Sequence, residues 1–202
     1  MGTIDRGLSL WDEATESFTH FDYNPEDPNS LANNQVNAIT ESHDGTLWVG
    51  TSWGLCHFNE ATHDFTRHHR KPHIPESIGS NDIFHIFFDS NNTMWVSTRF
   101  GGVSIYDPGK RKFMHYKSVF SDPYSLSDNN VTSFAEDGSG NIWVGIDGGG
   151  INYLDRSTNQ FSHIFSDPNV PSGLTNDKVI ALMLDSEGLL WIGMWGGGVN
   201  VY

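Results

Sequence analysis

The chain contains little cysteine and few basic residues, and it has no long apolar run. Its 202 residues include one cysteine, Cys56, so no intrachain disulfide can form. The 11 Lys and Arg residues are outnumbered by 25 Asp and Glu residues, and the resulting formal charge of −14 disfavours nucleic acid as a partner. No stretch approaches the roughly 18 apolar residues that span a bilayer, and the first residues lack the pattern of a signal peptide. The sequence therefore predicts a globular, acidic chain that contains neither a membrane-spanning segment nor a signal peptide.

The chain does contain a repeat. Glycine (21 residues) and proline (8 residues) indicate frequent turns, and tryptophans recur at intervals of 47, 48 and 48 residues. These tryptophans are Trp48, Trp95, Trp143 and Trp191. Phenylalanines keep the same intervals, at Phe18, Phe65, Phe113 and Phe161. The distance from each Trp to the next Gly-aliphatic pair is the one interval that varies, so the repeat changes length just after the Trp.

Four short strands, called a to d below, fit each period. Strand a begins with an apolar residue such as Val36, strand b carries the Trp, strand c starts at a Gly-aliphatic pair such as Gly102-Val103, and strand d carries the Phe. Tight turns with Gly or Asn at left-handed positions, such as Asp44-Gly45, join strands a and b. No segment shows a 3.6-residue period. The pattern predicts an all-β fold of β-propeller repeats, with about four blades of four antiparallel strands.

The predicted blades are out of step with the ends of the chain. We expect one propeller segment over residues 1–202, with a partial blade at 1–22 and blades at about 34–69, 81–117, 129–165 and 177–202, the last incomplete. The chain opens and closes in strand c, which gives five c strands and four of each other kind. This surplus predicts a segment of a larger propeller, with open blade edges through which copies of the segment could associate.

Several phrases recur with these strands. They are Asp-Pro-Asn-Ser-Leu (27–31), Asp-Pro-Tyr-Ser-Leu (122–126), Glu-Asp-Gly-Ser-Gly-Asn-Ile-Trp-Val-Gly (136–145) and Leu-Trp-Ile-Gly-Met-Trp-Gly-Gly-Gly-Val (190–199). A proline precedes the Leu or Ile by three residues in every repeat, at Pro28, Pro75, Pro123 and Pro171. In these phrases the chain resembles the two-component regulator propeller repeat. It departs from that pattern at Ile78, at Ser97 and at Ser42, which stands where the other repeats have aspartate.

The resemblance implies a function and a location. Members of that family form propellers in the periplasmic or extracytoplasmic sensor part of membrane histidine kinases, and others precede diguanylate cyclase modules. Where ligands are known, they are carbohydrate fragments. The resemblance therefore implies an oligosaccharide ligand, and it implies two further partners, the rest of the propeller and a signalling module of the full-length chain.

The residue pattern itself shows no catalytic or metal chemistry. His20, His115 and His163 share one repeat position on different blades, so they cannot converge on one ion, whose ligands need bonds of ~2.0–2.1 Å. The recurring Asp89, Asp137 and Asp185 are interpreted as turn formers. No nucleophile motif, phosphate loop or Cys-His pairing occurs. We therefore predict a chain that is not an enzyme and needs neither a cofactor nor a metal.

The candidate binding residues follow from topology. In an up-and-down blade the b–c and d–a connections emerge on one face, called the loop face here, and the a–b and c–d turns emerge on the other, the turn face. The loop face carries the one length change, and loops on a rigid scaffold are frequent binding sites. The candidates in the b–c connections are Ser52, Trp53, Arg99, Phe100, Asp147 and Trp195. Those at the ends of the d–a connections are Asn81, Asn129 and Asp177.

Three functions fit these observations. The first is a sensor propeller that binds an oligosaccharide, because aromatic faces beside Asn, Asp and Arg suit ring stacking and hydrogen bonds to hydroxyls. The second is a protein-interaction scaffold that uses the same face. The third is a propeller glycosidase or lyase. For each aromatic candidate, packing between blades is the alternative role, and for the Asn and Asp candidates it is capping of strand a.

Overall fold

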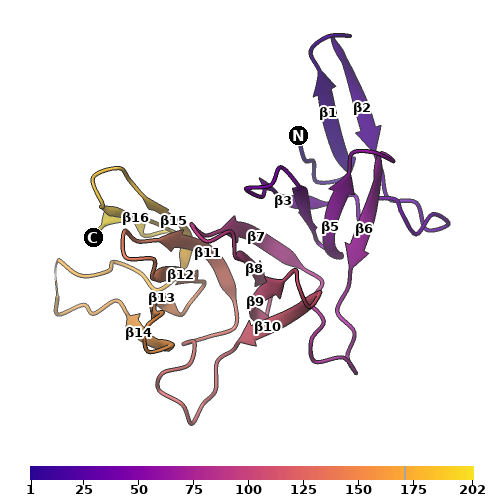
Figure 1. Cartoon of the computed structure of the whole chain (residues 1–202). Coiled ribbons are helices and arrows are strands. Elements are labelled where there is room, and N and C mark those ends of the chain that lie inside the picture. Colours follow the sequence, from indigo (N-terminus) through magenta and orange to yellow (C-terminus); the bar gives the residue numbers. More distant parts are fainter. Residues whose placement is uncertain (171) are drawn as a thin grey trace.

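The computed structural model describes residues 1–170 and 172–202, so Pro171, one of the four recurring prolines, lies outside the described residues. The described part forms seventeen strands in separate antiparallel sheets, which follow one another in an arc (Figure 1). It contains no helix that could cross a membrane. The prediction of an all-β propeller segment with four-stranded antiparallel blades is confirmed.

The strands lie close to their predicted places. The partial blade contains β1 (Leu8–Asp12) and β2 (Ser17–Phe21). Blade 1 contains β3 (Val36–Glu41), β4 (Leu47–Thr51), β5 (Gly54–Asn59) and β6 (Asp64–His68). Blade 2 contains β7 (Ile83–Phe88), β8 (Met94–Thr98), β9 (Gly102–Asp107) and β10 (Lys112–Tyr116). Blade 3 contains β11 (Val131–Glu136), β12 (Ile142–Ile146), β13 (Gly150–Asp155) and β14 (Gln160–Ile164). Blade 4 contains β15 (Val179–Leu184), β16 (Leu190–Met194) and β17 (Gly198–Val201).

The N-terminal residues differ from expectation. Met1 to Thr3 lie beside β1 as the end of a strand b: Gly2 bridges Leu8, and the Ser9 N–H donates to the Met1 carbonyl at 2.8 Å. The chain therefore opens in strand b, not in strand c. Sequence reasoning missed this because the repeated Trp, which marks strand b elsewhere, is absent there.

The inner strands of neighbouring blades run in the same direction. The amide nitrogen of Asn37 donates to the Ile83 carbonyl at 2.9 Å, and the Thr40 hydroxyl donates to Ile86 at 3.0 Å. At the junction between blades 3 and 4, the Thr132 hydroxyl donates to the Val179 carbonyl at 2.9 Å. Because these strands start at the same end, all the b–c and d–a connections share the loop face, and all the a–b and c–d turns share the turn face.

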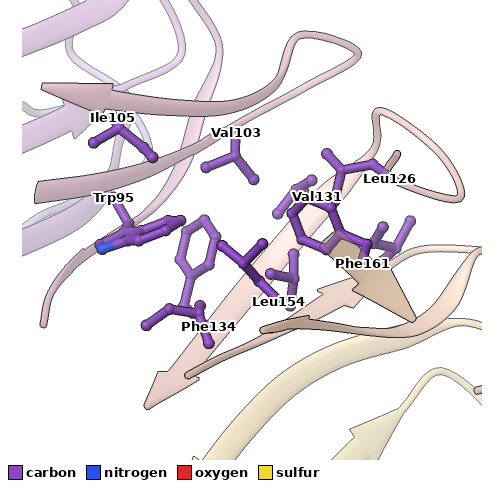
Figure 2. Close-up of a cluster of buried hydrophobic side chains, with 11 residues drawn as sticks. Trp95, Val103, Ile105, Leu126, Val131, Phe134, Leu154 and Phe161 are labelled. Atoms are coloured by element: carbon purple, nitrogen blue, oxygen red, sulfur yellow. The ribbon is translucent and has the colours of Figure 1, made fainter. Parts of the chain in front are cut away.

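Apolar side chains fill the space between blades. Between blades 2 and 3 the Trp95 indole, 2% exposed, packs with Val103, Phe134 and Leu154 (Figure 2). Burying a Trp removes ~150–250 Å² from water, so at ~25 cal/mol/Å² Trp95 stabilises this junction by several kcal/mol as an upper bound.

Close packing also explains the glycine that follows Trp-Val. A Cβ on Gly50 would lie 2.6 Å from Cγ2 of Ile83, and one on Gly145 would lie 2.8 Å from Cγ1 of Val179. Both contacts come from strand a of the next blade. The glycine therefore sets how closely successive blades approach.

The recurring aspartates are turn formers, as predicted. Asp89 accepts the N–H groups of Asn91 and Thr93 through Oδ1 and the indole N–H of Trp95 through Oδ2, at 3.0, 2.8 and 2.9 Å. Asp137 and Asp185 accept the equivalent turn N–H groups. The carboxylate thus closes the a–b turn, and in blades 2 and 4 it also holds the Trp ring of its own blade.

Two of the recurring histidines, His115 and His163, bond a carbonyl of a d–a connection, whereas His20 pairs with the Ser9 hydroxyl at 2.9 Å. The Nε2 atom of His115 lies 2.9 Å from the Ser77 carbonyl, while Nδ1 pairs with the Ser104 hydroxyl at 3.1 Å. His163 reaches the Ser125 carbonyl at 2.8 Å in the same way. In blade 1 the equivalent residue is Arg67, whose guanidinium bonds the carbonyls of the preceding connection.

Candidate functional site

The b–c connections differ in length between blade 1 and the other blades. In blade 1 the ladder ends at Thr51 and Gly54, so Ser52 and Trp53 form a two-residue connection. In blade 2 it ends at Thr98 and Gly102, with three residues between. The Thr51 hydroxyl donates to the Gly54 carbonyl at 2.8 Å and braces the tighter loop. The length change predicted from the sequence is therefore a real difference on the loop face.

Three b–c connections present large aromatic side chains to solvent. Trp53 is 60% exposed, Phe100 72% and Trp195 70%. Trp53 and Phe100 occupy the same position of their loops, and Trp195 stands one position earlier, where blades 1 to 3 have Ser52, Arg99 and Asp147. In the described part of the chain, none of the three rings is buried between blades. Trp195 lies on blade 4, which no later blade of this chain covers.

Phe100 adopts a backbone conformation that normally favours glycine. Its φ is +58°, and the equivalent residues of blades 3 and 4 are Gly148 at +83° and Gly196 at +72°. A bulky residue with positive φ costs of the order of 1–3 kcal/mol. The strained backbone holds an exposed ring, so the strain is not repaid by burial of that side chain.

Arg99 lies beside Phe100 and is held in place from two sides. Its guanidinium carbon lies 5.5 Å from the Phe100 ring centroid and 5.8 Å from that of Phe84, and Nη1 is 3.7 Å from Asp82 Oδ2. Burial raises the pKa of Asp82, and the guanidinium partly offsets this effect. The side chain of Arg99 is 54% exposed, so the pair contributes little stability and leaves donors free for a ligand.

Asp147 presents an exposed carboxylate from the b–c connection of blade 3. Its Oδ2 accepts from the Asn130 amide at 3.2 Å, and its backbone bridges Lys178 in the connection to blade 4. In blade 1 the Ser52 hydroxyl pairs with Asn33 Oδ1 at 3.1 Å. Both candidates therefore contact the connection that leads into strand a, on the loop face as predicted.

The d–a candidates hold their own loops. Oδ1 of Asn81 accepts the Arg70 N–H at 2.6 Å, that of Asn129 accepts Ser118 at 2.9 Å, and that of Asp177 accepts Ser166 at 2.6 Å. Asn34 makes the same bond with Tyr23 at 2.7 Å. One oxygen of each is thus committed to a repeated structural bond, and a role in ligand contact remains a prediction.

The loop face brings some candidates together and keeps others apart. Arg99 and Phe100 contact each other, but in the described residues no hydrogen bond, ion pair or ring contact joins candidates of different blades. Sequence reasoning missed Phe84, which supports Arg99, and Phe120, which is fully exposed in a d–a connection. Phe84 follows the first apolar residue of strand a and so points away from the core, which was the available signal.

Among the described residues, no three His, Cys, Asp or Glu side chains are grouped as metal ligands would be. The polar groups of the loop face are instead suited to hydrogen bonding and ring stacking.

The family comparison coincides with the blades. The model of the two component regulator propeller matches residues 30–53, 77–100, 125–148 and 173–196. Each match includes strands a and b of one blade and stops in its b–c connection. None of the curated proteins compared with the chain matches it.

Solved structures with this fold include extracellular domains of two component systems. An extracellular domain ascribed to the hybrid two component system BT4673 of B. thetaiotaomicron matches 99% of this chain, with a TM-score of 0.80 and 24% identity. That of BT3049 from the same organism matches 99%, with a TM-score of 0.67 and 27% identity. Virginiamycin B lyase from Staphylococcus aureus matches 83%, with a TM-score of 0.54 and 15% identity, which shows the fold alone.

This chain spans a smaller part of those proteins: it covers 25% of the BT4673 domain and 31% of the BT3049 domain. Four matches to one repeat model, one in each of blades 1 to 4, coincide with strands that the sequence periodicity had already located. The chain belongs to the two component regulator propeller family.

Proposed function

We propose that this chain is the ligand-binding, sensory part of a two-component signalling protein, and that its loop face recognises an extracellular oligosaccharide. The similarity to extracellular domains of hybrid two component systems supports a periplasmic or extracytoplasmic location and a sensory role. In this proposal the propeller carries no catalytic step, and a separate signalling module of the full-length chain responds to the bound state.

One observation carries the proposal: Phe100 combines an exposed ring with positive φ at a position where blades 3 and 4 have glycine. Strain of this kind persists where surrounding structure holds it, and it clusters at binding sites. Trp53 presents a ring from the same position of blade 1. Blades 1 and 2 thus both present an aromatic ring at this position, and in blade 2 the ring is present despite its conformational cost.

The neighbouring polar groups favour a sugar as the ligand. Flat rings stack on the apolar face of a pyranose, while Arg99 and Asp147 supply a hydrogen-bond donor and acceptors for hydroxyls. The exposed Arg99 side chain already lies against Phe100, so ring and guanidinium form one contact surface. Such a surface binds a neutral or acidic oligosaccharide without a metal.

Calorimetric titration with a glycan panel tests this proposal. We expect Phe100→Gly, which removes the ring and relaxes the backbone, to weaken binding at least tenfold while the protein remains folded. The control is Met114→Ala, which removes another exposed hydrophobic side chain (58%) from outer strand β10. Unchanged affinity in Phe100→Gly and Trp53→Ala would refute the assignment of the loop face.

A protein-interaction scaffold is the second candidate, because exposed aromatics beside an arginine are also frequent anchors of protein interfaces. Capture of one defined protein partner, together with no response to any glycan, would favour it. A glycosidase or lyase is the third candidate. The similarity to the S. aureus lyase shows only the fold, so turnover of a glycan in the same titration would be needed to support an enzyme.

The open edges suggest the remaining partners. Blade 4 has three strands where blades 1 to 3 have four, and its Trp191 and Val201 are 40% and 49% exposed. We propose that these edges are covered by the rest of the propeller in the full-length chain, and that the isolated segment self-associates through them. Light scattering that shows a stable monomer at high concentration would contradict this.

A further inference from the structure

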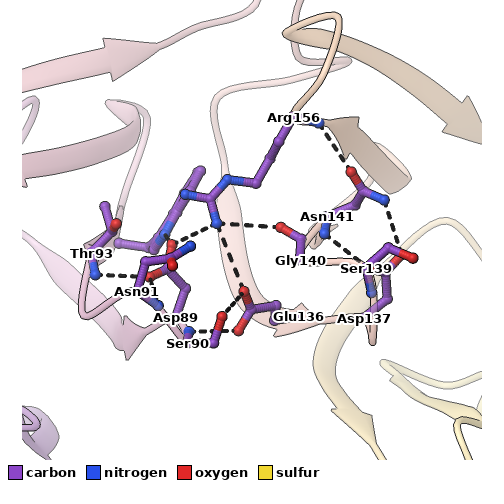
Figure 3. A network of polar contacts seen from close by, with 11 residues as sticks. Asp89, Ser90, Asn91, Thr93, Glu136, Asp137, Ser139, Gly140, Asn141 and Arg156 are labelled. Atoms are coloured by element: carbon purple, nitrogen blue, oxygen red, sulfur yellow. Dashed lines mark hydrogen bonds and ion pairs between the residues drawn. The ribbon is translucent and has the colours of Figure 1, made fainter.

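The turn face of the junction between blades 2 and 3 is filled by a charged network (Figure 3). The completely buried carboxylate of Asp89 pairs with Nη1 of Arg156 at 2.9 Å and accepts the Trp95 indole N–H at the same distance. The guanidinium also lies 3.7 Å from Glu136 Oε1 and 5.7 Å from the Trp95 ring centroid. Arg156 thus fills the space beside Trp95, and the pair of Asp89 and Arg156 is called the plug of this junction below.

The junction between blades 1 and 2 lacks all three charged groups. Counted by repeat, Ser42 takes the place of Asp89, Phe88 that of Glu136 and Pro108 that of Arg156. The Ser42 hydroxyl instead bonds its own turn, at 2.5 Å to Asp44 and 3.0 Å to the Thr46 carbonyl. Among the described residues, no guanidinium or carboxylate therefore stands at these three positions of the junction.

A groove of about 750 Å³ occupies this place on the turn face. Its apolar walls come from both blades: Trp48 and Phe58 from blade 1, and Tyr106 and Pro108 from blade 2. Trp48 meets Tyr106 edge-on, with ring centroids 5.6 Å apart. Blades 1 and 2 are both complete in this chain, so the groove does not depend on any further blade.

The groove offers hydrogen-bond donors without partners. The Trp48 indole N–H has no acceptor among the described residues, although the same group of Trp95 and of Trp191 binds a carboxylate oxygen at 2.9 and 2.7 Å. Arg111 lines the groove and, in the described part of the chain, has no acidic group within 4.0 Å. An N–H that binds carboxylate in two blades is thus left free, and Trp48, which carries it, lines the same groove as Arg111.

Other groups at the groove limit the charge of a ligand. Asp44 and Glu60 also line it, so a second negative charge on the ligand would be repelled. His57 and His68 pair with each other at 3.3 Å, and burial lowers the pKa of both, to about 4 for His68. They are therefore neutral at pH 7 and add no charge of either sign.

We propose that the groove between blades 1 and 2 binds a small aromatic monocarboxylate. Its ring packs against Trp48 and Tyr106, and its carboxylate accepts from the Trp48 indole N–H and from Arg111. The ligand carboxylate then replaces the one that Asp89 supplies in the next junction. The site lies on the turn face and is independent of the function proposed for the loop face.

Benzoate is a suitable probe, followed through the indole N–H signals in two-dimensional NMR of the full 202-residue chain. We expect a saturable shift of the Trp48 signal, which Trp48→Phe identifies by its loss. Benzyl alcohol has the same ring without the charge, and phthalate has a second charge, so both should bind at least tenfold more weakly. Equal binding of benzyl alcohol would refute recognition of the carboxylate.

Two variants locate the site. Ser42→Asp combined with Pro108→Arg installs the plug of the next junction and should abolish benzoate binding. Arg111→Gln should weaken it at least tenfold, whereas Arg70→Gln, which removes a cation away from the groove, should not. Binding that survives both groove variants, or no binding of benzoate to the parent chain, overturns the proposal. Phe100→Gly should leave benzoate binding unchanged, which separates this site from the loop face.

Discussion

Two junctions have the same arrangement of strands but differ in the side chains that fill them. They are the junction between blades 1 and 2 and the junction between blades 2 and 3. Both bury a repeated Trp against strand a of the next blade, with Trp48 7% and Trp95 2% exposed. At the junction between blades 2 and 3, the pair of Asp89 and Arg156 fills the turn face. At the junction between blades 1 and 2, the turn face has a groove. The recurring residues form the blades, so the ion pair and the groove, which each occur at one of these two junctions, are found where a repeat departs from the others.

The largest expected effect comes from removing the carboxylate of the filled junction. Asp89→Ser should destabilise the chain by about 3–5 kcal/mol, because it leaves Arg156 and the Trp95 N–H without their partner in a buried place. Urea unfolding measures this change.

The matched control is Asp185→Ser, which breaks the same turn and the same bond to a Trp, but in blade 4, where no later blade of this chain covers it. We expect it to cost about 1 kcal/mol. Equal costs for the two variants would show that the turn, and not the ion pair, stabilises the junction.

Acid should weaken the junction of blades 1 and 2 first. Burial lowers the pKa of His68 from 6.5 to about 4, so the folded chain binds fewer protons there than the unfolded chain between these values. The resulting stability is complete above pH 6.5 and is lost as the pH falls towards 4, by about 3 kcal/mol.

The equivalent residue of blade 2 is Tyr116, whose pKa is raised by burial and which does not titrate in acid. His68→Tyr should therefore flatten this part of the pH dependence, as measured by thermal unfolding from pH 7 to pH 4. His73→Gln, at an exposed histidine, is the control for a general effect of losing a histidine. An unchanged slope in His68→Tyr would contradict the assignment.

Transfer of the plug has a smaller expected effect. In Ser42→Asp with Pro108→Arg the new carboxylate and guanidinium should interact by about 1 kcal/mol beyond the sum of the single changes, since the groove is only partly shielded from solvent. A double-mutant cycle measures this coupling. Strictly additive effects would show that the two junctions differ in backbone geometry as well as in side chains.

The smallest expected effect is at the rim of the filled junction. Glu136→Gln should cost about 0.5–1 kcal/mol, because the ion pair with Arg156 at 3.7 Å is lost while the amide oxygen can still accept from Ser90. Raising the salt concentration should lower the stability of the parent more than that of the variant. A cost as large as that of Asp89→Ser would place the centre of the network at Glu136 instead.

The sequence was sufficient for the fold because the blade depends on recurring residues. Trp, Phe and Gly recur at fixed positions, and Gly50 shows why: the next blade leaves no room for a side chain there. The partner of Asp89 was not predictable in this way. Arg156 lies 67 residues after Asp89, at a repeat position where blade 2 has Pro108. Comparing equivalent positions of the repeats does not show which different positions contact each other.

The candidate site was predictable only in part. The loop face and its length change followed from the strand order, but the exposure of Trp53 and Phe100 did not, since buried and exposed aromatics look alike in a sequence. The positive φ of Phe100 could have been predicted, because the same position is glycine in blades 3 and 4, at Gly148 and Gly196. The recurrence of Asn81, Asn129 and Asp177 likewise pointed to the loop bonds that they make.

The bonds between inner strands bear on how such a ring evolves. Asn37, Thr40 and Thr132 reach the next blade through side chains, while each main-chain ladder closes within its own sheet. A duplicated or deleted unit of about 48 residues therefore leaves every remaining ladder intact. The new seam needs the same few polar side chains, together with main-chain bonds such as that from the Gly102 N–H to the Asn129 carbonyl at 3.0 Å. Blade number can change by whole units in gene duplication, and single seams can then diverge without disturbing their neighbours.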